Sequence, residues 1–138
     1  MFDPKAASSF DGFTGPYALY TVARINSIHK KSRLRRGFGG QVKVNCELLK
    51  EPEEKQLVLN LAQFPEIVKK AFENYNPSVI AKYVFDMAKS FNDFYNKHSV
   101  LNAPDAGLTK ARLALSFTVK QTLENALGLL AIETVEEM

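Results

Sequence analysis

Residues 77–97 carry the sequence PSVIAKYVFDMAKSFNDFYNK, and its pattern decides the fold class. Apolar side chains recur along it at steps of three and four: Ile80, Val84, Met87, Phe91 and Phe94, with Tyr83, Ala88 and Tyr95 widening the stripe. This spacing is typical of one face of an α-helix and differs from the alternation of a strand. Asn76 and Pro77 are a capping residue followed by a proline, which is a common helix start. The stretch therefore predicts a long amphipathic helix that needs partner helices.

Similar patterns on either side of this helix predict those partners. The spacing predicts helices over residues 16–31, 53–63 and 66–74, the last two separated at Pro65. A further helix is expected after Asp105, with a stripe made of Leu108, Ala111, Leu115, Val119, Leu123, Ala126 and Leu130. Glycines predict a loop over 33–40, and residues 41–46 suggest a short extended piece. Together the patterns predict an all-α bundle of about five helices.

The length of 138 residues fits one domain, and residues 1–14 are expected to be an irregular lead-in to it. A composition with 46% hydrophobic and 24% charged residues excludes wholesale disorder. No apolar run approaches the roughly 20 residues that span a bilayer, and the first residues do not resemble a secretory signal. The single cysteine, Cys46, suits a reducing compartment, so we expect a cytoplasmic protein with no membrane partner.

The net charge of +3 is unevenly distributed along the chain. Between residues 24 and 43 there is no acidic side chain but there are seven basic ones: Arg24, Lys30, Lys31, Arg33, Arg35, Arg36 and Lys43. The rest of the chain therefore carries a net charge of −4. A local basic run of this kind is either a solvated loop or a surface for phosphates, and the run alone does not decide between them.

The residues offer little for catalysis. His29 and His98 are isolated in the sequence, and with one cysteine they leave no ligand set for a structural zinc. The glycines at 37–40 lack the lysine and hydroxyl positions of a phosphate-binding loop. Paired acids such as Glu53 and Glu54 are expected to solvate the surface. We therefore predict no catalytic residue, no metal site and no cofactor within these residues.

A binding surface is the better prediction. Tyr17, Tyr20 and Arg24 follow one side of the first helix at helical spacing, and Tyr95 lies beside polar groups at the end of its own helix. Tyrosines can stack unpaired bases, and arginine can stack or pair with phosphate. Tyrosines at such spacing are more often part of a core with hydroxyls at its edge, so the residues alone favour a core while leaving the binding interpretation open.

Several segments resemble the anticodon-binding domain of arginyl-tRNA synthetases. The clearest runs from Phe10 to Ile25 (FDGFTGPYALYTVARI), and others lie at 61–66 (LAQFPE), 91–96 (FNDFYN), 111–115 (ARLAL) and 125–132 (NALGLLAI). The matches span nearly the whole chain, in order. Leu19 departs from the family's usual glutamine. The family's Asp-Ala-Leu-Arg signature is present only in part, beginning at Asp105.

The resemblance implies a helical bundle of the class I synthetase type that grips the anticodon stem and loop of an arginine tRNA. By residue-wise correspondence it implies anticodon-loop contacts from Tyr17, Tyr20, Arg24, Tyr95 and Met138. Charge alone makes five further side chains candidate phosphate contacts: Lys30, Lys31, Arg33, Arg35 and Arg36.

In the family a separate catalytic domain uses ATP and Mg²⁺ to attach arginine to its tRNA. The resemblance therefore implies a parent arginine–tRNA ligase, with that catalytic domain as a partner and no role for DNA. A stand-alone helical adaptor, or an RNA-binding paralogue without ligase activity, is the alternative. An adaptor would show an apolar exposed stripe where the RNA-binding interpretation expects a basic and aromatic one.

Overall fold

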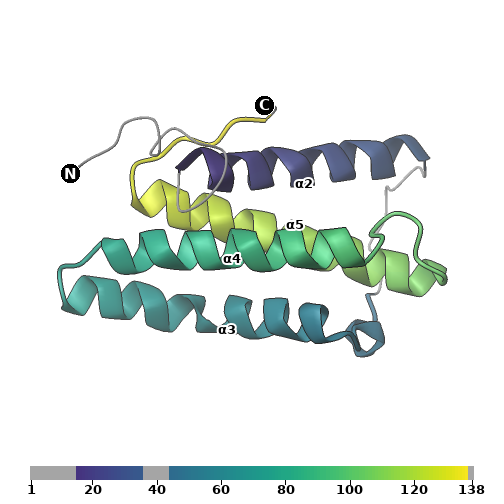
Figure 1. Ribbon diagram of the computed structural model, residues 1–138, viewed down its shortest axis with the longest axis horizontal. Coiled ribbons are helices and arrows are strands. Elements are labelled where there is room, and N and C mark those ends of the chain that lie inside the picture. The colour runs from purple at the N-terminus through teal and green to yellow at the C-terminus, as the bar shows by residue number, and fades with distance from the viewer. Residues whose placement is uncertain (1–14, 36–43, 137–138) are drawn as a thin grey trace.

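The computed structural model describes residues 15–35 and 44–136 (Figure 1). The elements in these ranges are α2 (Gly15–Arg35), a short 3-10 helix η1 (Cys46–Leu48), α3 (Pro52–Glu73), α4 (Ser78–Lys97) and α5 (Ala106–Leu129). No strand occurs in the part of the chain that is described. The predicted all-α bundle is therefore confirmed.

The two C-terminal helices form the centre of the bundle. Helix α4 packs against α5, and both α2 and α3 pack against this central pair. Figure 1 shows α2 and α3 at opposite edges, with α4 and α5 between them. The segment after α5 turns back beside α2, where Asn26 Nδ2 donates to the Glu136 carbonyl oxygen at 3.1 Å. This arrangement leaves the α2–α4 face and the α3–α5 face on different sides of the molecule.

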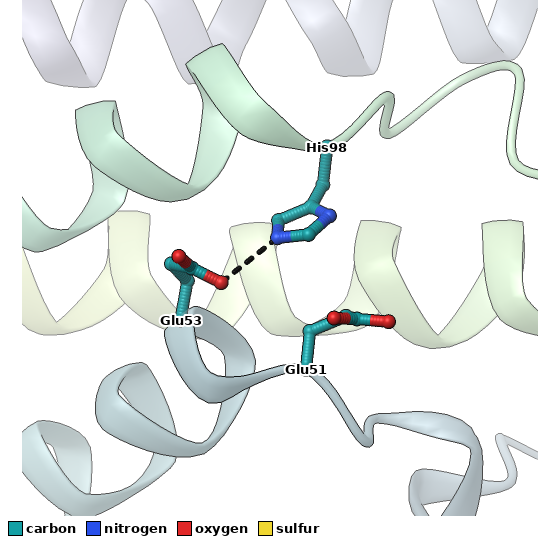
Figure 2. A group of neighbouring side chains, drawn as sticks. All are labelled: Glu51, Glu53 and His98. Atoms are coloured by element: carbon teal, nitrogen blue, oxygen red, sulfur yellow. Dashed lines mark hydrogen bonds and ion pairs between the residues drawn. The ribbon is translucent and has the colours of Figure 1, made fainter.

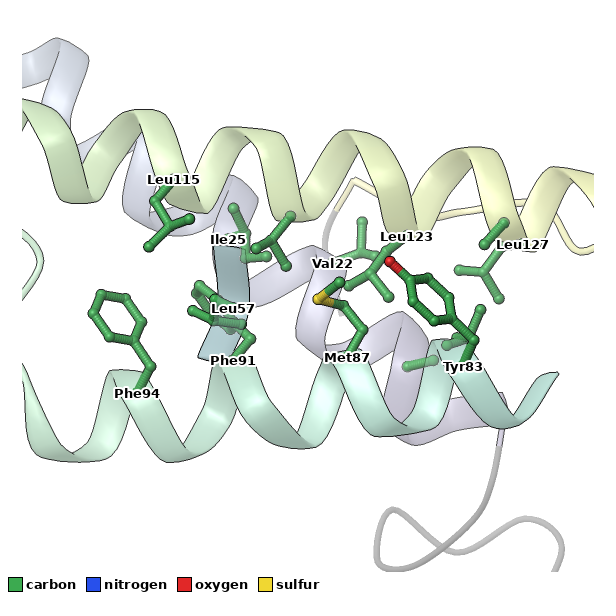
Figure 3. Close-up of a cluster of buried hydrophobic side chains, with 14 of the residues drawn as sticks. Val22, Ile25, Leu57, Tyr83, Met87, Phe91, Phe94, Leu115, Leu123 and Leu127 are labelled. Atoms are coloured by element: carbon green, nitrogen blue, oxygen red, sulfur yellow. The ribbon is translucent and has the colours of Figure 1, made fainter. Parts of the chain in front are cut away.

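The core lies along the axis between these helices (Figure 3). Its largest fully buried members include Ile25, Leu57, Met87, Phe91, Phe94, Leu123 and Leu127. The apolar stripe predicted for residues 77–97 is buried throughout, except at Tyr95, which is 38% exposed. Burial of each large apolar side chain contributes on the order of 1.5–3 kcal/mol. The repeated spacing in the sequence therefore selects the faces that hold the bundle together.

Local sequence explains where the helices begin. Helix α3 starts with a capping box, in which the Glu51 amide donates to Glu54 Oε2 at 3.0 Å. Asn76 Oδ1 accepts from the Ser78 amide at 3.1 Å, and α4 follows. Asp105 Oδ2 accepts from the Leu108 amide at 2.9 Å, so the predicted cap of α5 is confirmed.

The predicted break at Pro65 is wrong. Residues 52–73 form one helix with Pro65 inside it, so the described residues contain four α-helices rather than about five. An internal proline removes one hydrogen bond and costs about 3 kcal/mol. Phe64 and Ile67, on either side of it, both pack against the core. This packing holds the helix together through the proline.

Two further boundaries differ from the prediction. Helix α2 extends to Arg35, so 33–35 are helical where a loop was expected. Arginine and leucine are good helix formers, and the first glycine of the expected loop comes only at position 37. The expected extended piece is borne out at Asn45, whose backbone is extended, but it ends there, because Cys46 opens a 3-10 turn. Asn45 Oδ1 caps this turn by accepting from the Glu47 amide at 3.0 Å. The rest of that piece, 41–43, lies outside the described residues.

Glu53 and Glu54 were expected to solvate the surface, and for Glu54 this expectation is wrong. Its side chain is 0% exposed, and Oε1 lies 2.6 Å from Nε of Arg112, which is 7% exposed. Arg112 Nη1 also donates to the Ser99 carbonyl oxygen at 3.0 Å. Burying a charge is costly unless it is paired and hydrogen-bonded, and both conditions are met here. The pair joins the start of α3 to α5 and to the α4–α5 loop.

No helix in the described ranges combines the length and the apolar character needed to cross a membrane.

Candidate nucleic-acid interface

The α2–α4 face brings together three of the residues predicted for RNA contact. Tyr20 and Arg24 are one turn apart on α2, and Tyr95 comes from α4. The guanidinium carbon of Arg24 lies 4.7 Å from the Tyr20 ring centroid and 5.3 Å from the Tyr95 ring centroid. Arg24 Nη2 also donates to the Tyr20 hydroxyl at 3.0 Å. A cation in contact with two aromatic rings is a stable arrangement with both stacking and charged character.

The two tyrosines of this cluster do not belong to the core. Tyr20 is 40% exposed and Tyr95 is 38% exposed. Tyr95 keeps one contact with the interior, since its ring stacks on that of Phe91 at a centroid distance of 6.2 Å. Tyr17 is more enclosed, and its ring lies 5.5 Å from that of Phe85. The core interpretation is therefore wrong for Tyr20 and Tyr95 and holds in part for Tyr17.

A shallow cleft follows this cluster along the surface. Its lining comes mainly from α2, with additions from α4 and the loop after it: Tyr20, Ala23, Arg24, Ser27, Ile28, Lys31, Tyr95 and Leu101. The cleft lining thus includes two members of the predicted basic run, Arg24 and Lys31, together with the aromatic residues. The combination of exposed rings with two cations in one cleft is suited to unpaired bases and the phosphates between them.

The other predicted residues are placed less directly. Lys30 is exposed and lines a second hollow together with His29, Phe117 and Lys120. The backbone of 33–35 forms the last turn of α2, which places Arg33 and Arg35 near the same end of the bundle. Arg36 and Met138 lie outside the described residues. The basic run therefore continues from the aromatic cluster toward the C-terminal end of α2.

One residue of the cluster was not predicted from the sequence. Asn92 on α4 is 7% exposed, and its Oδ1 accepts from Arg24 Nη1 at 2.7 Å. Its Nδ2 donates to the Tyr17 hydroxyl at 3.0 Å and to Thr21 Oγ1 at 3.1 Å. The available signal was its position next to Phe91, at the edge of the most regular apolar stripe in the chain. A polar side chain there must find a partner when it is buried.

A second cluster of polar side chains joins α3 to the end of α4 (Figure 2). Glu51, Glu53 and His98 have ligand atoms within 4.8 Å of one another, and His98 Nε2 lies 2.9 Å from Glu53 Oε2. The sequence suggested that His98 is isolated, but in the structure it has two acidic neighbours. Lys97 Nζ lies 2.6 Å from Glu53 Oε1 and already supplies a cation there. We interpret the group as an ion-pair cluster that ties the two helices together.

The charges of this cluster are reflected in its titration. Hydrogen bonds from Lys97 and His98 lower the pKa of Glu53 from its ordinary 4.5 to about 2. The same bond to Glu53 raises the pKa of Lys97 above its ordinary 10.5. The ionised pair is thus the stable form between strongly acidic and strongly basic pH.

The α3–α5 face has a different character. A groove there is lined mostly by apolar groups: Cys46, Leu49, Lys55, Val58, Leu59, Leu61, Ala111, Ala114, Leu115 and Thr118. Val58 is 46% exposed and Leu59 is 58% exposed. An apolar stripe of this kind is what the adaptor alternative expects, but it lies on a different face from the aromatic and basic cluster.

Comparison with known proteins shows the family to which the chain is related. Over all of its 138 residues, the chain is 44% identical to an arginine–tRNA ligase of Clostridium botulinum. It is 39% identical over 137 residues to the ligase of Phocaeicola vulgatus. It covers 24% and 22% of these relatives, so it spans about a quarter of their length.

Solved structures give the same picture. The arginyl-tRNA synthetase of Thermus thermophilus matches with a TM-score of 0.81 and 37% identity, and that of Plasmodium falciparum with a TM-score of 0.73 and 25% identity. Each match covers 94% of this chain and 22% of the other. The family model described as the DALR anticodon binding domain matches residues 18–138. The family expected from the sequence motifs is confirmed, and the chain belongs to the DALR anticodon-binding domains.

Proposed function

We propose that this chain binds the anticodon stem and loop of tRNA through the α2–α4 face. The observation that carries the proposal is the contact of the Arg24 guanidinium with two exposed tyrosine rings, at 4.7 Å and 5.3 Å. Unpaired bases stack on exposed aromatic rings, at about 1–3 kcal/mol per base. Loops are the part of a tRNA whose bases can be splayed out in this way. Tyr20 and Tyr95 are therefore the proposed stacking residues.

Charge would complete the interaction. Lys31 lines the same cleft, and Lys30 lies one residue before it on α2. In this proposal they contact phosphates, as do Arg33, Arg35 and Arg36, while Tyr17 and Met138 extend the contact with the loop. Phosphate contacts position the protein on RNA, whereas contacts with the bases provide specificity. The basic run thus supplies affinity, and the tyrosines and Arg24 supply the base contacts.

We further propose that the chain is the C-terminal domain of an arginine–tRNA ligase of the cytoplasm. The relatives that it matches over its whole length carry that name, and the chain corresponds to about a quarter of each. In this assignment ATP, Mg²⁺ and the transfer of arginine belong to another domain of the ligase. The role of the present residues is to hold the anticodon arm of an arginine tRNA.

A gel-shift titration tests the proposal. The chain is titrated against the anticodon stem-loop of an arginine tRNA and against that of a tRNA for another amino acid. We expect tighter binding to the arginine stem-loop, with an affinity that falls as salt rises. Equal binding of both stem-loops would contradict anticodon recognition. No binding of either at low salt would favour the adaptor alternative, with the apolar α3–α5 groove as the surface to examine.

A further inference from the structure

Asn92 connects the two helices of the proposed interface through a single buried amide. All three of its hydrogen bonds described above reach α2: to Arg24 from the oxygen, and to Tyr17 and Thr21 from the nitrogen. The three partners lie on successive turns of that helix. At 7% exposure, water cannot easily replace these bonds. The amide therefore fixes the position of this part of α2 relative to α4.

The chemistry of the partners requires an amide at this position. A guanidinium only donates hydrogen bonds, so the oxygen of Asn92 must face Arg24. The Thr21 hydroxyl already donates to the Tyr17 carbonyl oxygen at 3.0 Å, so toward Asn92 it can only accept. Asn92 must therefore accept on one side and donate on the other. An aspartate of the same shape would place a second acceptor against the Thr21 lone pairs.

The consequence for Arg24 is that its guanidinium is held at two points. Nη1 is bound by Asn92 Oδ1 at 2.7 Å, and Nη2 is bound by the Tyr20 hydroxyl at 3.0 Å. Only the first of these bonds comes from a buried group, since Tyr20 is 40% exposed. A side chain that is already fixed in its binding geometry loses less freedom when the ligand arrives. The buried bond is the one that supplies this order.

We infer that Asn92 is a positioning residue of the RNA-binding surface. It holds Arg24 in place and does not itself contact the RNA. This inference rests on the proposed function. Without the amide, Arg24 keeps its charge but loses the anchor that holds it against Tyr20 and Tyr95. The binding energy of the stacked arginine then falls, while the helices remain packed through the core.

A double-mutant cycle tests the inference. Asn92→Ala, Arg24→Ala and the double variant are compared with wild type by fluorescence anisotropy, using the labelled anticodon stem-loop of an arginine tRNA. We expect each single variant to lower the affinity about tenfold and the double variant to lower it by no more than about twice that, because the two residues act as one unit. Two independent residues would instead give about a hundredfold loss in the double variant.

Asn60→Ala is the matched control. Asn60 Nδ2 donates to Ser90 Oγ at 3.0 Å, so this variant also deletes an amide-to-hydroxyl bond to α4, but on the side of α3. We expect its RNA affinity to equal that of wild type, and thermal unfolding shows whether each alanine variant is folded under the conditions of the binding measurement. If Asn92→Ala does not fold, Asn92→Ser replaces it in the cycle, because its hydroxyl is too short to reach Arg24.

The outcomes separate the two claims. If wild type and Arg24→Ala bind the stem-loop equally, the proposed function fails and the inference fails with it. If Arg24→Ala weakens binding but the Asn92 variant behaves like Asn60→Ala, only the inference is overturned. A double variant that shows the independent, hundredfold loss overturns it as well.

Discussion

The guanidinium of Arg112 lies against the carboxylate of Glu54 inside the bundle, with 2.6 Å between Nε and Oε1. Glu54 is 0% exposed and also accepts from the Glu51 amide at the start of α3. Arg112 belongs to α5 and donates to the Ser99 carbonyl oxygen in the α4–α5 loop. One buried ion pair therefore joins the start of α3 to the N-terminal part of α5 and to the α4–α5 loop.

Removal of the charge on Glu54 should destabilise the protein strongly. Glu54→Gln keeps the size of the side chain but leaves the Arg112 cation buried without its counter-ion, and such a change costs about 3–5 kcal/mol. Urea unfolding at neutral pH measures the loss. Glu66→Gln, at an exposed position of the same helix, should change the free energy of unfolding by no more than about 0.5 kcal/mol. A loss below about 1 kcal/mol for Glu54→Gln would show that the buried pair is not required.

The ionised Glu53 carboxylate should make the free energy of unfolding depend on pH in the acidic range. Its pKa is about 2 in the folded protein and near 4.5 when unfolded, so the unfolded chain binds more protons between these values. The stability contributed by Glu53 is complete above about pH 5 and is lost as the pH falls through 4.5 toward 2. Glu53→Gln removes this contribution. We therefore expect wild type to be more stable than Glu53→Gln at pH 6 and the difference to shrink at pH 3.

Urea midpoints at the two pH values give this comparison. Glu73→Gln, an exposed position near the other end of α3, should keep the wild-type dependence on pH. A constant difference between wild type and Glu53→Gln across the range would mean that the hydrogen bonds of Glu53 with Lys97 and His98 do not form in solution.

The basic run should be visible in the salt dependence of RNA binding. Each phosphate contact on a single strand contributes about 0.7 to the slope of log affinity against log salt. Neutralising Lys30 and Lys31 together, as Lys30→Gln with Lys31→Gln, should therefore reduce the slope by about 1 to 1.5. The same double change at Lys69 and Lys70, both exposed on α3, should leave it unchanged. An unchanged slope for the first pair would identify the run as a solvated surface.

The residues that could be predicted from the sequence are those whose role follows from local spacing. The stripe of residues 77–97 identifies the buried face of α4, and Asp105 marks the start of α5. The break at Pro65 could not be judged locally, because the packing of Phe64 and Ile67 against the core decides whether the helix continues. Local preference is a weak guide where tertiary packing opposes it.

The same limit applies to the candidate site. Tyr20 and Arg24 could be proposed from their one-turn spacing on α2, but the contact of Arg24 with Tyr95 joins positions about 70 residues apart. Asn92 and Glu54 were missed because a polar residue is recognised as buried only when its partner is known. Arg24 and Arg112, which pair with them, come from other helices. The sequence motifs therefore identify the surface, and the structure identifies what holds it in place.

The most direct test of the account compares two exposed tyrosines. Tyr20 lies in the proposed RNA cleft and is 40% exposed, while Tyr75 follows α3 and is 90% exposed. The measurement is the affinity of Tyr20→Ala and of Tyr75→Ala for the anticodon stem-loop of an arginine tRNA, with thermal unfolding to show that both fold. Loss of one stacked base, about 1–3 kcal/mol, predicts a fall of roughly 5- to 150-fold for Tyr20→Ala and none for Tyr75→Ala. Equal affinities for the two variants would contradict the assignment of RNA binding to the α2–α4 face.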